Sequence, residues 1–121
     1  MKQIRTILTL AALALPMPTF AHEATGPNGG RVVDAGNYHV ELVVNGTQVD
    51  VFVSDGNDKP VAPGRFKATA IFNAGGKVQR VALTGDMAKL TGKAEASLPG
   101  NVRGIVQLTL PDGKTAQGQF K

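Results

Sequence analysis

The feature that most constrains the fold of this chain is a series of short stretches in which apolar and polar residues alternate, separated by turn residues. Alternation with a period of two is typical of strands that bury one face. After residue 21, no stretch of ten or more residues has apolar positions at helical spacing. The pattern predicts an all-β protein with strands at 31–34, 38–44, 47–54, 65–73, 77–84, 93–98, 102–110 and 114–120, and it leaves 87–90 undecided.

The dipeptide Asn45-Gly46 predicts the first hairpin, because Asn-Gly is a strong signal for a two-residue type I′ turn. Such a loop fixes which residues face one another, and a shift by one residue would mix apolar with polar side chains. The predicted register forms an apolar face from the pairs Tyr38 with Val53, Val40 with Val51, and Leu42 with Val49. On the other face it places Glu41 opposite Asp50 and His39 opposite Phe52.

Two further turns predict hairpins in the second half of the chain. Gly75-Gly76 suits a two-residue loop, and residues 111–113 suit a three-residue loop with Gly113 in the left-handed region. The pairings that follow are Ala70 with Val81, Ala68 with Leu83, and Leu108 with Ala116. Residues 57–64 contain two prolines, which cannot donate to a ladder, so we expect a loop or an edge segment there.

Seven or eight short antiparallel strands without a helix favour a β-sandwich of immunoglobulin-like type, with a small β-barrel as the alternative. Residues 31–121 are long enough for one modest core and too few for two, so a single domain is expected. Residues 22–30 contain three glycines and show no apolar periodicity. We expect this segment to be a flexible amino-terminal arm unless something ties it down.

Residues 1–21 are predicted to be a signal peptide that is removed on export. They begin with basic residues, continue with an apolar run over 7–15 and end with small residues before His22. That run is too short to cross a bilayer, which needs about 20 residues. We therefore expect cleavage before His22 and a periplasmic protein whose mature chain does not span the membrane.

The composition argues against several classes of function. Without Lys2 and Arg5 the chain has 11 basic and 9 acidic residues, and it has one Tyr and no Trp. Nucleic-acid binding proteins rely on basic stripes and aromatic platforms, which are missing here. There is no cysteine for a disulfide, a thiolate metal site or a nucleophile, and neither histidine stands in a recognisable catalytic context. We expect neither nucleic-acid binding nor enzymatic activity.

The outward face of the first predicted hairpin carries His39, Glu41 and Asp50. Like charges directly opposite one another destabilise a sheet. A cation beside them would remove the repulsion, and imidazole with carboxylates suits divalent transition metals. The sequence therefore indicates a candidate metal site at these three residues, with an ordinary solvated surface as the alternative.

His22 is the fourth candidate metal ligand. If the mature chain begins there, its α-amine and its imidazole form a chelating pair that an internal histidine lacks. Such a pair can bind Cu(II), which has the highest affinity for nitrogen ligands among the common divalent metals. The alternative is that His22 belongs to an unordered tail without a special role.

The segment 26–44, GPNGGRVVDAGNYHVELVV, resembles one found near the start of heavy-metal-efflux membrane-fusion adaptors and in small periplasmic proteins associated with metal resistance. Asn28 stands where that pattern has a histidine. The chain is also similar, more loosely, to periplasmic copper-binding β-sandwiches that use an amino-terminal histidine. The residues that match the first pattern are Pro27, Gly29, Gly30, Tyr38, His39, Glu41 and Leu42.

The sequence thus supports two functions of different classes. The first is a periplasmic metal-binding module for copper or zinc, with His22, His39, Glu41 and Asp50 as ligands. The resemblance implies a role in metal efflux or resistance, with an efflux adaptor protein as the partner. The second is a non-metal interaction module of the bacterial envelope that pairs an edge strand with another protein.

Overall fold

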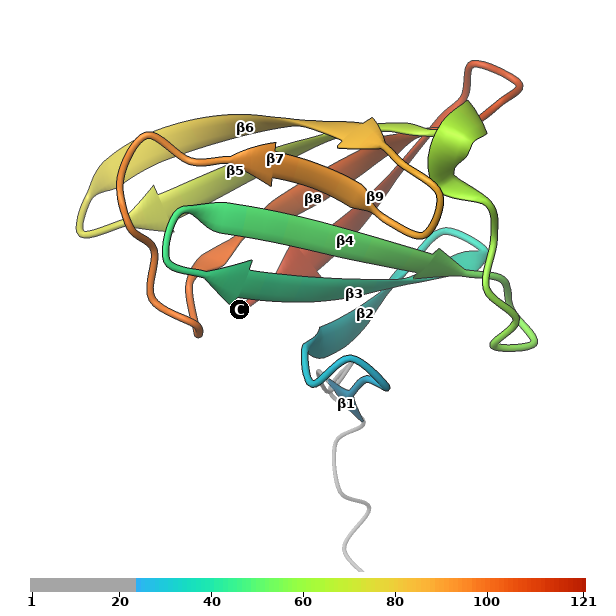
Figure 1. The fold of residues 1–121 in the computed structure, drawn as a ribbon, viewed down its shortest axis with the longest axis horizontal. Helices are drawn as coiled ribbons and strands as arrows, with labels where there is room; N and C mark the ends of the chain where they lie inside the picture. The colour runs from blue at the N-terminus through green and yellow to red at the C-terminus, as the bar shows by residue number, and fades with distance from the viewer. Residues whose placement is uncertain (1–23) are drawn as a thin grey trace, which may run out of the picture.

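The computed structural model describes residues 24–121, which form nine strands and one short 3₁₀-helix (Figure 1). The prediction of an all-β protein is confirmed. None of the helical structure in the described part is long and apolar enough to cross a membrane. The elements are β1 (Ala24–Thr25), β2 (Arg31–Ala35), β3 (Tyr38–Asn45), β4 (Gln48–Ser54), η1 (Pro63–Arg65), β5 (Lys67–Ala74), β6 (Lys77–Gly85), β7 (Leu90–Lys93), β8 (Arg103–Thr109) and β9 (Thr115–Phe120).

All nine strands belong to one antiparallel sheet with the order β1-β2-β3-β4-β7-β6-β5-β8-β9. The sheet curls into a half-barrel, and its concave face holds the core (Figure 1). The predicted two-sheet, immunoglobulin-like sandwich is therefore wrong. A small barrel describes the curvature better, although β1 and β9 remain the two ends of the hydrogen-bonded order.

Strand β7 is the reason that the chain forms one sheet. It pairs with β4 through residues 90–93 and with β6 through residues 90–91, so it joins the two halves of the molecule. The sequence left 87–90 undecided and predicted a strand at 93–98 instead. Residues 94–98 form no strand, and they lie against the β3–β4 turn, where the N–H of Ala94 donates to the carbonyl of Thr47 (2.8 Å).

The β3–β4 hairpin has the predicted faces and a different register. Its loop is Gly46-Thr47, with Gly46 at φ 65°, which suits a turn with glycine at the first central position. Every pairing across the hairpin is shifted by two residues from the prediction. Glu41 therefore lies opposite Phe52, and Asp50 lies opposite Val43, so the predicted facing pair of Glu41 and Asp50 is wrong.

The two hairpins predicted in the second half of the chain are confirmed. Gly75 and Gly76 both have positive φ, as a type I′ turn requires. At the last turn, the N–H of Gly113 donates to the carbonyl of Leu110 (2.9 Å), and Gly113 has a φ of 85°. The observed pairings are Ala70 with Val81, Ala68 with Leu83, and Leu108 with Ala116.

The core fills the concave side of the sheet. It contains the inward residues of β2 to β9, including Val40, Val51, Phe72, Leu108 and Phe120, which are almost fully buried. Two segments cover the open ends of the half-barrel. One end is covered by η1 and Phe66, and the other is covered by residues 94–102 (Figure 1). Because the core occupies this face, the polar side chains of β2, β3 and β4 are directed to the outer face, where the candidate site lies.

Candidate functional site

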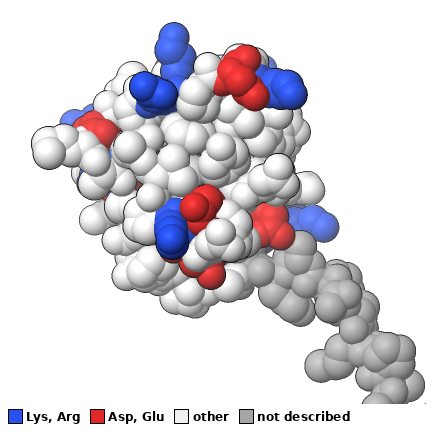
Figure 2. All heavy atoms as spheres, turned by 90° about the vertical axis from the view of Figure 1, so that its right-hand side faces the viewer, with Lys and Arg blue, Asp and Glu red and all other residues white. Residues whose placement is uncertain are grey.

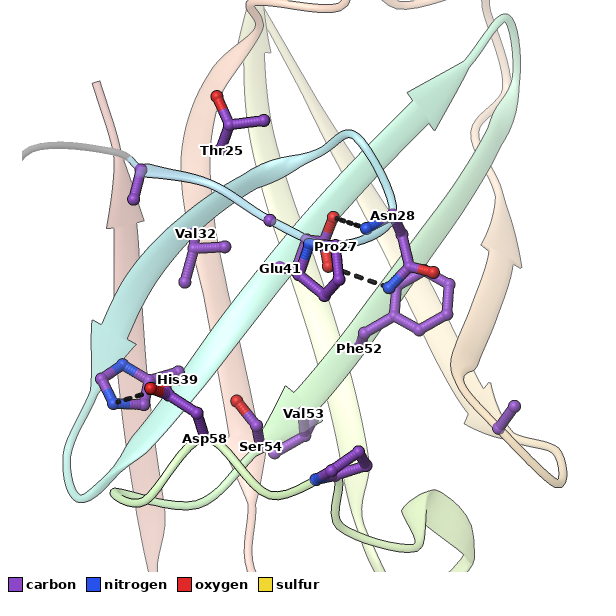
Figure 3. Close-up of a pocket in the computed structure, with 14 residues that line it drawn as sticks. Thr25, Pro27, Asn28, Val32, His39, Glu41, Phe52, Val53, Ser54 and Asp58 are labelled. Atoms are coloured by element: carbon purple, nitrogen blue, oxygen red, sulfur yellow. Dashed lines mark hydrogen bonds and ion pairs between the residues drawn. The ribbon is translucent and has the colours of Figure 1, made fainter.

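The candidate site is a groove of about 310 Å³ on the outer face of β2, β3 and β4. Residues 24–28 form one wall, the end of β4 contributes Ser54, and the loop after β4 contributes Asp58 and Pro60. Val32 and Phe52 give the groove an apolar floor. Figure 3 shows His39 and Asp58 at one end of the groove, and Glu41 with Asn28 at the other.

His39 is held between two carboxylates that come from different elements. Its Nδ1 lies 2.8 Å from Oδ1 of Asp34, which is the residue opposite it on β2. Its Nε2 lies 3.6 Å from Oδ1 of Asp58, in the loop after β4. The His39 side chain is 32% exposed and lines the groove.

The loop that carries Asp58 is stabilised by Asp55. The Oδ1 atom of Asp55 accepts the backbone N–H groups of Asn57 (2.8 Å) and Lys59 (3.0 Å). These two bonds, led by the one from Lys59, hold the pKa of Asp55 below its usual value, and the charges of Lys59 and His39 add to the effect. Asp58 has a φ of 62°, the only positive φ of a non-glycine residue in the described chain. Aspartate tolerates this conformation better than most residues, so the loop can hold its carboxylate beside His39.

Glu41 occupies the other end of the groove and is nearly fully buried (4% exposed). Its two oxygens accept three hydrogen bonds: from the backbone N–H of Asn28 (2.9 Å), from Nδ2 of Asn28 (2.9 Å) and from the backbone N–H of Gly30 (2.8 Å). A Cβ on Gly26 would lie 2.3 Å from Cδ of Glu41, so the turn lies directly on the carboxylate. Glu41 thus ties residues 26–30 to the sheet.

The described part of the expected arm, residues 24–30, is therefore held in two ways. Ala24 and Thr25 pair with Val32 and Arg31 as β1, and the following turn is bound by Glu41. Asn28, at the position where the resemblance has a histidine, supplies both a backbone and a side-chain donor to Glu41. The Asn28 amide therefore has a structural role, because it helps to hold the turn on Glu41.

Asp50 lies outside the groove, at the junction with β7. Its carboxylate accepts hydrogen bonds from Oγ1 of Thr91 (2.7 Å) and Nε2 of Gln48 (3.2 Å), and it forms an ion pair with Nζ of Lys89 (3.1 Å). Lys89 lies at the end of the β6–β7 turn, directly before β7, so the interaction helps to hold β7 beside β4. Asp50 and Glu41 face different neighbours, and a cation is not needed to offset repulsion between them.

The four residues predicted as metal ligands are thus not brought together as a group. His39 and Glu41 line the same groove, whereas Asp50 does not, and His22 lies outside the described residues. Within residues 24–121, no cluster of three or more His, Asp or Glu side chains is placed to hold a metal ion.

Sequence reasoning missed the two carboxylates beside His39. Asp34 could have been found, because a two-residue loop at Gly36-Asn37 places Asp34 opposite His39, and this is the observed pairing. Asp58 could not have been found from the sequence. It lies in an irregular loop whose path depends on the isolated bridge between Ser54 and Pro60. Periodicity carries no information about such a loop.

Comparisons with models of known protein families, with curated proteins and with solved structures found no match for this chain.

Proposed function

We propose that the chain is a periplasmic module that binds a divalent copper or zinc ion at the His39 end of the outer groove. The ligands in the described part are Nε2 of His39 and the carboxylate of Asp58. Asp34 is a positioning residue, which accepts the Nδ1 proton and holds the ring. Glu41 and Asp50, which the sequence indicated as ligands, have structural roles in this proposal.

The observation that carries the proposal is the 3.6 Å separation between Nε2 of His39 and Oδ1 of Asp58. Two ligand atoms at about 2.1 Å from one tetrahedral ion lie roughly 3.4 Å apart. The other ring nitrogen contacts Asp34 at 2.8 Å, and histidine ligands commonly donate their second N–H to a carboxylate in this way. The pair therefore has the spacing and the orientation of two ligands of one ion.

Two protein ligands are too few for tight binding, and the proposed amino terminus supplies the others. Ala24 lines the groove, and two residues of chain span at most about 7 Å. A mature chain starting at His22 would therefore carry its α-amine and imidazole close to the groove.

The test is calorimetric titration of the mature protein, starting at His22, with Cu(II) and with Zn(II). We expect His39→Ala and Asp58→Asn each to weaken binding by tenfold or more, since each removes a ligand. Asp34→Asn should weaken it by roughly 10- to 100-fold, as is typical of residues that orient a metal-binding histidine. The matched control is Glu95→Gln, because Glu95 is an exposed carboxylate that does not line the groove.

A second pair of proteins separates the two parts of the proposal. Blocking the α-amine by one added residue before His22 should weaken Cu(II) binding, because the amine can no longer act as a free ligand. Equal affinities for the native protein and His39→Ala would exclude His39 as a ligand. Loss of binding on blocking the amine, with no effect of His39→Ala, would reduce the site to the chain terminus alone.

A further inference from the structure

A second groove, of about 580 Å³, lies on the outer face of the other half of the sheet. Its apolar lining comes from Ile71 on β5, Val78 on β6 and Ile105 on β8, together with the two buried aromatic residues Phe72 and Phe120. Val78 is 65% exposed, which makes it one of two large apolar side chains with high exposure in the described chain. This surface is separate from the groove at His39, which lies over β2, β3 and β4.

The register places two arginines beside the apolar residues. Ile71 lies opposite Arg80 on one side and opposite Ile105 on the other. Two residues further along β5, on the same face, Asn73 lies opposite Val78 on β6 and opposite Arg103 on β8. Because neighbouring strands are about 4.8 Å apart, the two arginines flank a short apolar strip from opposite sides.

The charged residues on the strands of this half of the sheet are all basic. Strands β5, β6, β8 and β9 contain no Asp or Glu, whereas they carry Lys67, Lys77, Arg80 and Arg103. The acidic residues of the described chain all lie in β2, β3, β4 or in loops. Neither Arg80 nor Arg103 takes part in an ion pair with another described residue.

The end of the molecule near the β2–β3 turn looks different. There, acidic and basic side chains lie next to one another on a largely uncharged surface (Figure 2). Strands β5, β6, β8 and β9 differ in having basic residues without acidic ones, and the acidic residues of this half lie in its loops, at Asp86, Glu95 and Asp112. An uncompensated basic surface with an apolar centre attracts an acidic partner and adds to its rate of association.

We infer that this groove binds an extended, acidic polypeptide segment of another protein, one that alternates carboxylates with small apolar side chains. Its carboxylates would contact Arg80 and Arg103, and its apolar side chains would cover Ile71, Val78 and Ile105. The amide groups of Asn73 and Gln119, which also line the groove, can donate to and accept from a peptide backbone.

Two other kinds of polyanion fit this surface less well. Val78 is the only apolar side chain of the groove with high exposure, because Phe72 and Phe120, which also line it, are buried. A lipid surface is bound more firmly where large apolar or aromatic groups can enter it. Single-stranded nucleic acid needs exposed aromatic side chains on which bases stack. A peptide requires neither.

The test uses a terminally blocked, fluorescein-labelled peptide that alternates glutamate with valine and threonine, and fluorescence anisotropy with the mature protein. Added EDTA makes the result independent of the metal proposal. We expect Arg80→Gln and Arg103→Gln each to weaken binding about two- to fivefold, and the double variant about tenfold. Raising the salt concentration should weaken binding further. Arg65→Gln is the matched control, since Arg65 is exposed on η1 outside the groove.

The inference is overturned if the double variant binds the peptide as well as the native protein does. It is also overturned if a peptide with glutamine in place of glutamate binds equally well, because charge would then play no part. Flotation with phosphatidylglycerol vesicles and titration with a single-stranded oligonucleotide complete the test. Binding to either of these through Arg80 and Arg103, without binding of the acidic peptide, would replace the proposed partner by a membrane or a nucleic acid.

Discussion

Glu41 and Asp50 are the two buried acidic side chains of the described chain, and each is satisfied in a different way. Asp50 accepts bonds from neighbouring strand residues and pairs with Lys89, whereas Glu41 accepts only from the turn at 28–30. Buried carboxylates are costly unless they are paired or fully hydrogen-bonded. At the scale of single residues, Glu41 is therefore one of the two features that hold the amino-terminal turn on the sheet, beside the pairing of β1 with β2.

We predict that Glu41→Gln destabilises the protein by about 1–3 kcal/mol, because the negative charge that strengthens all three hydrogen bonds is lost and the new amide nitrogen would face the Nδ2 donor of Asn28. Urea denaturation measures the change. Glu95→Gln makes the same chemical change at an exposed position and should stay within about 0.5 kcal/mol of the native protein. Equal midpoints for the two variants would show that the turn does not depend on Glu41.

At the scale of elements, aspartates organise the irregular connections between strands. In the β6–β7 turn, Oδ1 of Asp86 accepts the N–H groups of Ala88 and Lys89, both at 2.9 Å. These bonds, led by the one from Ala88, lower the pKa of Asp86 from its usual value of 3.8. Asp55 has the same arrangement in the loop that carries Asp58.

The lowered pKa of Asp86 predicts the sign of a pH effect on stability. A group whose pKa is lower in the folded than in the unfolded state stabilises the fold above its unfolded pKa, and this contribution is lost as the pH falls through the folded pKa. The native protein should therefore be more stable than Asp86→Asn at pH values above 3.8, and the difference should shrink as the pH falls below that value. Denaturation curves across this range measure it. A difference that grows on acidification would contradict the assignment.

At the scale of the whole molecule, the curvature of the sheet brings β9 close to β2. In the hydrogen-bonded order these strands are far apart, since β2 is second and β9 is last. Gly118 marks the contact: a Cβ there would lie 2.8 Å from Cγ2 of Val33 and 3.6 Å from Cβ of Ala35. The absence of a side chain at 118 thus allows the two strands to approach and the core to close.

Gly118→Val should therefore destabilise the protein by about 1–3 kcal/mol, as is usual when atoms are forced into a packed core. Thermal or urea denaturation can measure this. A useful comparison is Gly100→Val, since a Cβ at Gly100 meets nothing within 4 Å and Gly100 does not have a positive φ. If both variants are equally stable, β2 and β9 can separate without cost.

The β3–β4 hairpin shows how far sequence patterns determine a sheet. The alternation of Val49, Val51 and Val53 fixed which side chains are buried, because a shift by one residue would have exposed them all. A shift by two residues preserves both faces. The pattern therefore could not distinguish a loop at Asn45-Gly46 from the observed loop at Gly46-Thr47.

That shift of two residues also determined the candidate site. In the predicted register Glu41 and Asp50 face each other, and a bound cation would offset their repulsion. In the observed register they are not opposite each other, so there is no such repulsion to offset. The polar partners of His39 come instead from β2 and from a loop. Contacts between separate elements depend on how the sheet curves and where the loops return, and neither is encoded in a local period.

The sequence by itself determined that the chain is all-β, which faces of its hairpins are buried, and the pairing across the two hairpins in the second half of the chain. These properties follow from local chemistry: a period of two, and glycines in turns that require positive φ. Only the tertiary structure decided that β7 joins two halves into one curved sheet, that Glu41 holds the amino-terminal turn, and that His39 lies between Asp34 and Asp58. These features depend on pairing between segments far apart in the chain, where several arrangements bury the same apolar faces and only the packing of the whole molecule selects one.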